Sequence, residues 1–182
     1  MALTEVNSKR CKVCGKWFIP FSTTKKVCST GCAIILMDDN RAAKERKAWR
    51  KEQKLKKEKL KTKRDHLKEA QKEFNAYIRE RDKGNPCISC NKHHPGQIHA
   101  GHYRSVGACP ELRFNEDNCH AQCAPCNNHK SGDIINYRIN LIDKIGDDRL
   151  SNLEGPHPMP NWSIDEIIGF KKEFKQKLKA LK

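Results

Sequence analysis

Closely spaced cysteine pairs constrain the fold of this 182-residue chain more than any other feature of its sequence. Cys11 and Cys14 are followed by Cys28 and Cys32, which gives the pattern C-x2-C-x13-C-x3-C. Two close pairs separated by a short loop can converge on one Zn²⁺ ion, and thiolates are the ligands that structural zinc prefers. The sequence therefore predicts an N-terminal zinc knuckle.

A second set of cysteines has the same character with a longer interval. Cys87 and Cys90 form one C-x2-C pair, Cys123 and Cys126 form another, and 32 residues separate the two pairs. This interval leaves room for a strand, a turn and a further strand held together at their base. We expect a second four-thiolate zinc site, closed and therefore structural rather than catalytic.

The charge of the chain indicates the kind of partner. It has 37 Lys and Arg against 22 Asp and Glu, a formal net charge of +15, and only 36% hydrophobic residues. Nucleic acid is the first candidate partner, because neutralising phosphates releases condensed counterions. No segment has the apolar length of a signal peptide or of a membrane span, so we expect no membrane association and a cytoplasmic location.

A long basic segment follows the first cysteine set. Residues 33–83 contain no Gly or Pro and are rich in helix-forming residues, which predicts a helix. Its second half has one apolar stripe that can dock on a neighbouring domain, made of Leu67, Ala70, Phe74, Tyr77 and Ile78. The basic face can be a solvated surface or an arm that contacts phosphate; a coiled-coil dimer is a third interpretation, although sustained heptads are absent.

Four segments are expected along the chain. These are a four-cysteine zinc knuckle (1–36), a long basic helix (37–83), a compact Cys- and His-rich core (84–155), and a proline-containing linker with a final helix (156–182). A helix within 133–153, with Gly146 near its end, should pack on the core, and Ser163 with Glu166 resembles a capping box that begins the last helix. The predicted fold class is α+β.

The catalytic candidates lie between the knuckles of the second cysteine set. His102 is followed by Asn118, five residues before Cys123, and Asn127 comes directly after Cys126. This order resembles the HNH (ββα-metal) nuclease pattern. His102 is the expected general base because an imidazole titrates near neutrality, and Asn118 would hold its ring or strand in orientation.

Metal and phosphate ligands follow from the same pattern. Asn127 supplies an oxygen that suits a hard ion such as Mg²⁺ or Mn²⁺, and Lys130 could contact phosphate. The HNH pattern commonly has Asp directly before the base, but Gly101 stands there, so His99 is the candidate second ligand. Residues three apart on a regular strand face opposite sides, so this assignment needs a bulge at residues 100–101; a structural or phosphate-binding role for His99 is the alternative.

Three further residues are candidate DNA contacts. Arg104 and Arg113 flank the proposed cleft and could bind backbone phosphates, although surface arginines often bind nothing specific. His120 could touch phosphate or metal, and a hydrogen bond that supports a ligand is an equally good interpretation.

Longer motifs are similar to one phage family. AGHY at 100–103, RFN at 113–115 and Q-C-x2-C-N-x2-K-S-G at 122–132 resemble the NinG/Rap recombination proteins over nearly the whole chain. The resemblance implies a structure-selective endonuclease that cuts branched DNA, including D-loops and Holliday junctions, in the cytoplasm of the bacterial host. Family members carry Asp where this chain has His99. The arrangement at Cys126-Asn127 is also similar to phage endonuclease VII, in which four cysteines bind zinc and the following Asn binds the catalytic ion.

We therefore expect a Mg²⁺- or Mn²⁺-dependent endonuclease with two structural zinc ions, acting on branched DNA, and paired incisions would suit a homodimer. Two alternatives remain open. One is an HNH nuclease that nicks DNA or cuts it without structural preference, because motif chemistry does not encode substrate shape. The other is a zinc-containing DNA-binding adaptor without catalysis.

Overall fold

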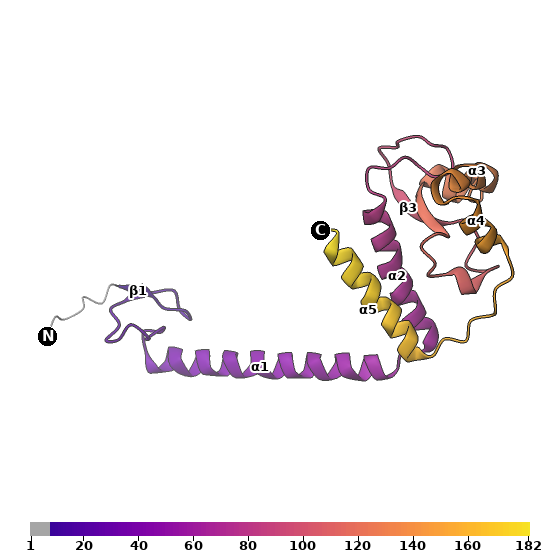
Figure 1. The fold of residues 1–182 in the computed structure, drawn as a ribbon. Helices are drawn as coiled ribbons and strands as arrows, with labels where there is room; N and C mark the ends of the chain where they lie inside the picture. Colours follow the sequence, from indigo (N-terminus) through magenta and orange to yellow (C-terminus); the bar gives the residue numbers. More distant parts are fainter. Residues whose placement is uncertain (1–7) are drawn as a thin grey trace. The chain divides into compact units, whose positions relative to one another are not determined.

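The computed structural model describes residues 8–182, and its fold is mixed α and β, mostly helical, as the sequence predicted (Figure 1). The chain forms two compact units, one up to Leu60 and the other from Lys61 to Lys182. Residues 1–7 of the expected 1–36 module lie outside the described residues. Within residues 8–182, no helix combines the length and apolar character that a membrane span requires.

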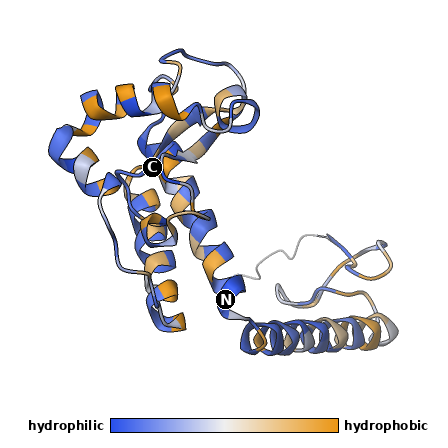
Figure 2. Ribbon diagram, turned by 90° about the vertical axis from the view of Figure 1, so that its right-hand side faces the viewer, coloured by the Kyte–Doolittle hydropathy of each residue, from blue (hydrophilic) through white to orange (hydrophobic). Residues whose placement is uncertain are grey.

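The N-terminal unit consists of a small hairpin and one long helix. Strands β1 (Lys9–Arg10) and β2 (Trp17–Phe18) pair antiparallel, and the loop between them carries the first cysteine pair. Helix α1 (Thr30–Lys59) begins after Ser29, whose side chain accepts a hydrogen bond from the backbone N–H of Cys32. None of the α1 residues is buried, and most of its ribbon is hydrophilic (Figure 2). This helix is therefore a solvated segment.

The segment 33–83 is helical as expected, and its continuity, which the sequence left open, is interrupted between two helices. Helix α1 ends at Lys59, and helix α2 (Lys63–Arg81) begins after a capping box. The Thr62 hydroxyl accepts from the backbone N–H of Asp65 at 3.3 Å, and the Asp65 carboxylate accepts from the backbone N–H of Thr62 at 3.0 Å. These bonds satisfy the first amides of α2 locally, which favours a new helix start over continuation.

The apolar stripe of α2 packs on the last helix, α5 (Ile164–Ala180), which runs beside it in the same direction (Figure 1). Phe74 and Phe174 meet edge to face with ring centroids 4.8 Å apart. The predicted stripe is confirmed, since Ala70, Phe74, Tyr77 and Ile78 are buried in one cluster. The Ser163–Glu166 capping box at the start of α5 is also confirmed.

A second hairpin lies against α2. Strands β3 (Ile98–His102) and β4 (Cys119–Cys123) pair antiparallel, with Ile98 opposite Cys123 and His102 opposite Cys119. The connecting loop includes one 3-10 turn, η1 (Pro110–Leu112), and a π-helical turn, η2 (Pro125–His129), follows β4.

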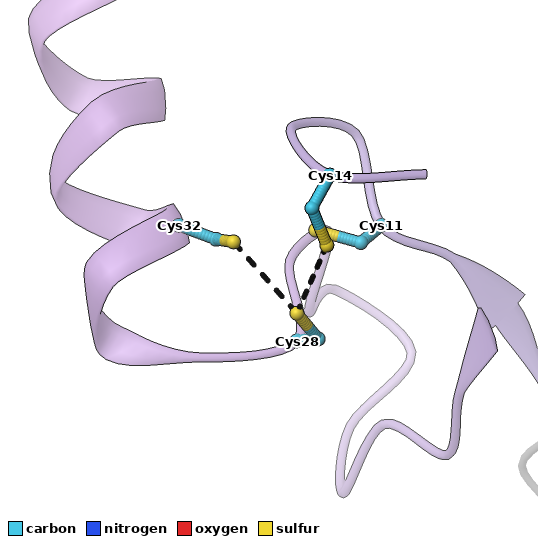
Figure 3. Close-up of side chains that lie close together, drawn as sticks. All are labelled: Cys11, Cys14, Cys28 and Cys32. Carbon is cyan, nitrogen blue, oxygen red and sulfur yellow. Dashed lines mark hydrogen bonds between the residues drawn. The ribbon is translucent and has the colours of Figure 1, made fainter. Parts of the chain in front are cut away.

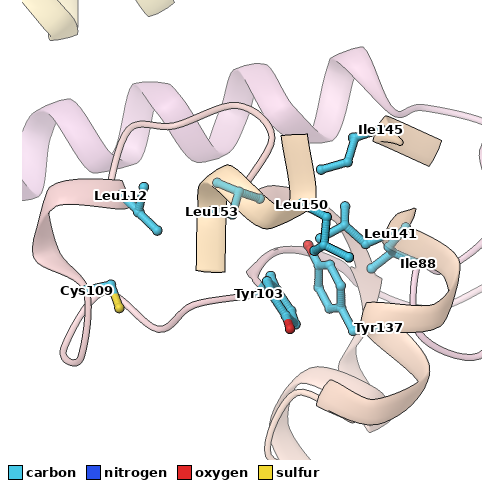
Figure 4. Packing of buried hydrophobic residues seen from close by; sticks show 9 residues of the cluster. All are labelled: Ile88, Tyr103, Cys109, Leu112, Tyr137, Leu141, Ile145, Leu150 and Leu153. Carbon is cyan, nitrogen blue, oxygen red and sulfur yellow. The ribbon is translucent and has the colours of Figure 1, made fainter. Parts of the chain in front are cut away.

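Two helices then cover the hairpin. They are α3 (Ile134–Ile145) and α4 (Asp147–Glu154), so the helix expected within 133–153 ends at Gly146, which has φ +84°, and a second helix follows. Only glycine adopts this backbone conformation readily. Tyr137, Leu141, Leu150 and Leu153 form the centre of a second buried cluster (Figure 4). This core positions the loops that contain the candidate site.

Candidate metal centres and active site

The first four cysteines form a compact cluster (Figure 3). The Sγ atoms of Cys14 and Cys28 are 3.5 Å apart, those of Cys28 and Cys32 are 3.7 Å apart, and ligand atoms of all four cysteines lie within 4.8 Å of one another. Four thiolates at about 2.3 Å from a tetrahedral Zn²⁺ would be about 3.8 Å from each other. The cluster is therefore compatible with a structural zinc site.

Backbone amides support this cluster. Hydrogen bonds from backbone N–H groups, that of Cys14 first, lower the pKa of Cys11 to about 6. A lowered pKa favours the thiolate, which is the form that binds metal.

The second cysteine cluster ties the base of the β3–β4 hairpin to the preceding loop. Its members are Cys87, Cys90, Cys123 and Cys126, and their sulfurs also lie within 4.8 Å of one another. The Sγ atoms of Cys90 and Cys123 are 4.0 Å apart, and the backbone N–H of Cys123 donates to Cys87 Sγ at 3.3 Å. The geometry is compatible with a second structural zinc, as the spacing predicted.

His94 is a neighbour of this cluster that the sequence interpretation missed. Its Nε2 lies 3.2 Å from Cys90 Sγ, although His94 belongs to an otherwise polar turn. Its spacing of four residues from Cys90 was the available signal. Hydrogen bonds to zinc-bound thiolates tune such sites, so His94 is placed to support a ligand.

His102 lies at the end of β3 beside a cleft. Its Nε2 is 3.0 Å from the carbonyl oxygen of Arg113, so in the neutral ring Nε2–H donates to that oxygen and Nδ1 carries the lone pair. Nδ1 lies 3.6 Å from the sulfur of Cys119, whose pKa is raised by burial. Burial lowers the pKa of His102, which keeps the ring neutral near pH 7. A neutral imidazole can accept a proton, and in His102 the accepting atom, Nδ1, is faced by the buried Cys119 thiol.

The cleft brings several predicted site residues together. It has a volume of about 620 Å³, and its lining includes His102, Arg104 and Asn127. His99 lies beside Asn127, with Nδ1 3.0 Å from the amide nitrogen. No carboxylate lines the cleft among the described residues.

The bulge that the assignment of His99 as a metal ligand requires at residues 100–101 is absent. The β3–β4 pairing is regular from Ile98 to His102, and His99 and His102 therefore point to opposite faces of the hairpin. Because β3 has no second neighbour in its sheet, its outer edge is free. Asn127 contacts His99 and also lines the cleft with His102, so these side chains gather around that edge.

Gly101 explains the missing aspartate in structural terms. A Cβ atom at this position would lie 2.9 Å from Cβ of Gln122, which is two residues beyond the β4 partner of Gly101, and closer still to the amide oxygen of that side chain. Gln122 is fully buried, so it has little freedom to move away. A carboxylate directly before His102 is therefore sterically excluded in this chain.

Asn118 holds the loop between the strands rather than the imidazole. It is fully buried; its Oδ1 accepts from the backbone N–H of Arg104 at 2.8 Å, and its Nδ2 donates to the carbonyls of Arg104 and Leu112 at 3.0 and 3.2 Å. Arg113, whose carbonyl accepts from His102, directly follows Leu112. Asn118 thus orients His102 through the loop backbone.

His120 does not fit its predicted contact with DNA or metal. Its side chain is buried, with Nδ1 2.9 Å from Nη2 of Arg81 and 3.5 Å from the carboxylate of Asp82, and Nε2 3.1 Å from the carbonyl of Asp117. Both ring nitrogens are engaged in the interior. The residue joins β4 to the end of α2, which is a structural role.

Lys130 and Arg104 remain accessible. Lys130 is exposed and lies 3.8 Å from the carboxylate of Asp133, an arrangement that leaves it able to reach phosphate. Arg104 lines the cleft, and its Nε donates to the sulfur of Cys109 at 3.5 Å.

Arg113 belongs to a basic groove on α2, which sequence reasoning did not connect with it. The groove has a volume of about 370 Å³ and is lined by Lys68, Gln71, Lys72, Asn75, Arg79 and Arg113. Arg113 donates to Gln71 Oε1 at 3.3 Å, and its Nε is buried without a hydrogen-bond partner. Among the described residues, no ion pair joins a carboxylate to any of the four cations. The α2 groove is therefore lined by four cations and, within the described part of the chain, by no carboxylate.

The fold and the two clusters define a mixed α and β protein with two four-cysteine modules compatible with zinc. The chain belongs to the Bacteriophage Lambda NinG protein family, which matches residues 3–182. It is similar to Protein ninG of Escherichia phage lambda, with 40% identity over 96% of this chain and 93% of that protein. Protein ninG of Salmonella phage P22 is also 40% identical, over 96% and 94%, and that of Escherichia phage 933W is 38% identical over the same shares. No solved structure matches the chain.

Proposed function

We propose that this NinG-family protein is a metal-dependent endonuclease of the HNH type that cuts branched DNA in phage recombination. The observation that carries the proposal is the cleft beside β3, whose lining includes a neutral His102 together with Asn127 and Arg104. Hydrolysis of a phosphodiester needs a base for water, positive charge at the phosphate and a stabilised leaving group.

Each of these needs has a candidate residue. Nδ1 of His102 takes a proton from water once the Cys119 thiol has moved away from it, while the Arg113 carbonyl holds the opposite edge of the ring and stabilises the imidazolium that forms. Arg104 and Lys130 bind phosphate oxygens. A divalent ion held by Asn127 and His99 would polarise the phosphate and stabilise the departing 3′ oxygen.

The donor set also bears on the choice of ion. An amide oxygen suits Mg²⁺ and Mn²⁺, whereas imidazole suits later transition ions better than Mg²⁺. Because the cleft has no carboxylate among the described residues and Gly101 leaves no room for one, Mn²⁺ should support cutting better than Mg²⁺.

DNA binding is supported by the α2 groove and by the net charge. The backbone carbonyl of Arg113 contacts the proposed base, and the side chain of Arg113 lines the α2 groove. The same residue would therefore connect a phosphate bound in the groove with the active site. Branched DNA as the substrate comes from the family resemblance. Paired incision of a junction needs two active sites, which a homodimer would provide.

The test is a cleavage assay on a synthetic four-way junction and a linear duplex of the same sequence, with Mg²⁺ or Mn²⁺ at one salt concentration. His102→Gln keeps a donor that can reach the Arg113 carbonyl but is not a base, so cutting should fall at least about 100-fold. His157→Ala, a half-buried histidine that does not line the cleft and whose Nε2 lies 2.9 Å from the Asn152 carbonyl, is the matched control and should cut normally. Undiminished cutting by His102→Gln would remove the proposed base, and equal cutting of the duplex would indicate a nuclease without structural preference.

A second function is favoured by one observation, the lack of a carboxylate among the described residues that line the cleft. A zinc-containing DNA-binding adaptor would need no such ligand. Tight binding of the junction with no product in either metal would support it.

A further inference from the structure

The N-terminal zinc module, defined as residues 8–37, has an unusual charge for a small folded segment. It contains no Asp or Glu. Its six cations are Lys9, Arg10, Lys12, Lys16, Lys25 and Lys26. A surface of this kind attracts a polyanion and repels basic partners.

The same module leaves aromatic rings in solvent. Trp17 is 67% exposed and Phe21 is 84% exposed, although Pro20 and Val27 near them in the chain are buried. Exposed rings of this size are normally found where something covers them. Their exposure on a metal-stabilised hairpin indicates a binding surface.

Each ring has a cation on it. The Arg10 guanidinium lies 5.8 Å from the centroid of the Trp17 ring, and these residues are directly opposite each other in the β1–β2 pairing. Lys25 Nζ lies 4.5 Å from the centroid of the Phe21 ring. A cation can cover only one face of a ring, so the second face remains free to stack while the cation stays close enough to pair with a phosphate.

Phe21 also borders a groove. The groove has a volume of about 480 Å³, and its lining includes Phe21, Lys25, Lys26 and Met37. Apolar walls with lysines among them fit a flat, uncharged base attached to a charged backbone.

We propose that the zinc module binds single-stranded DNA by stacking unpaired bases on Trp17 and Phe21 while its cations contact the phosphates. Unpaired bases are favoured over a duplex because paired bases hide their faces, whereas every unpaired base offers a face to a ring. This site is independent of the nuclease chemistry, and it would let the protein hold the unpaired strand at a branch.

The experiment measures anisotropy of a labelled dT15 oligonucleotide with the full-length, zinc-loaded protein in buffer without Mg²⁺ or Mn²⁺. Trp17→Ala and Phe21→Ala should each weaken binding about tenfold, since stacking is worth about 1–3 kcal/mol per base. The slope of log affinity against log salt should not change, because no charge is removed. Trp49→Ala is the matched control, since Trp49 is 62% exposed on α1, outside the module.

Conservative variants and different nucleic acids distinguish stacking from a general loss of apolar surface. Trp17→Phe should restore most of the binding, and Trp17→Leu should not. Binding of a duplex should be unaffected by Trp17→Ala, and rU15 should bind no more tightly than dT15. Any of four results would overturn the proposal. Both alanine variants could keep the wild-type affinity for dT15, or Trp17→Ala could lose as much affinity for a duplex as for dT15. Trp49→Ala could lose as much dT15 affinity as the module variants, or the protein could bind rU15 more tightly than dT15. Because cutting is not measured, failure of the nuclease assay leaves this result unaffected.

Discussion

Replacing Asn118 by Ala tests whether one buried amide organises the active-site loop. The substitution removes three hydrogen bonds to backbone groups of Arg104 and Leu112 in a fully buried position. At about 0.5–1.5 kcal/mol net for each bond, the free energy of unfolding should fall by about 3 kcal/mol. DNA cleavage should fall as well, because the carbonyl that holds His102 belongs to Arg113, the residue directly after Leu112.

Urea unfolding of the zinc-loaded protein, followed by circular dichroism, measures the stability loss. With a slope of about 1–3 kcal/mol per molar urea, the midpoint should fall by about 1–3 M. Asn152→Ala, an exposed position on α4, is the control and should change stability by less than about 0.5 kcal/mol. An Asn118→Ala midpoint equal to that of the control would refute the role assigned to this amide.

Asn118→Asp sharpens the same test. At pH 7 the new carboxylate would face the carbonyls of Arg104 and Leu112, to which the amide donates in the wild type. Its pKa should rise above the usual value of about 3.9, so the variant loses stability as pH increases through that raised pKa. The stability gap to wild type should therefore narrow as pH falls, and a gap independent of pH would contradict this geometry.

Two further predictions concern metal content and pH. Cys123→Ser should reduce the zinc content measured by elemental analysis from two ions to one per chain, because it removes one of the four ligands of a closed site. Cys109→Ser, outside both clusters, should keep two ions. Two zinc ions in both variants would contradict the second zinc site. Hydrogen bonds from Arg138, and then from Tyr103, lower the pKa of Glu154 to about 2 from the usual 4.5. The stability that the ionised Glu154 contributes is therefore complete above about pH 4.5 and is lost as pH falls towards 2. The difference in thermal unfolding temperature between the wild type and Glu154→Gln should shrink from pH 5 to pH 3. A difference that stays constant would show that the charge is not responsible.

The two cysteine clusters could be predicted from sequence because the spacing within each cysteine pair is local chemistry. Two cysteines separated by two or three residues already lie close enough to share an ion, whatever the remainder of the chain does. The apolar stripe of α2 and the cap at Ser163 were predictable for the same reason, since both depend on residues within a few positions of each other.

The helix breaks were less accessible. Thr62 with Asp65 is a capping box that is visible in the sequence, but the surrounding residues all favour helix and concealed it. Gly146 was also visible in the sequence as a residue that can end a helix. Only the structure shows that it ends α3 with a positive φ and that a further helix, α4, follows it.

Only the tertiary structure decided which polar residues of the site are accessible. His120 and His102 are both histidines near the same hairpin, yet His120 is buried against Arg81, 39 residues away in the chain, while His102 borders a cleft. Asn118 and Asn127 differ in the same way, since Asn118 is enclosed by the loop backbone, whereas Asn127 contacts His99 and lines the cleft. Residue type and spacing determine which groups can bind metal or accept a proton, but burial and hydrogen-bond partners come from segments distant in sequence, and their packing determines which groups are free to act.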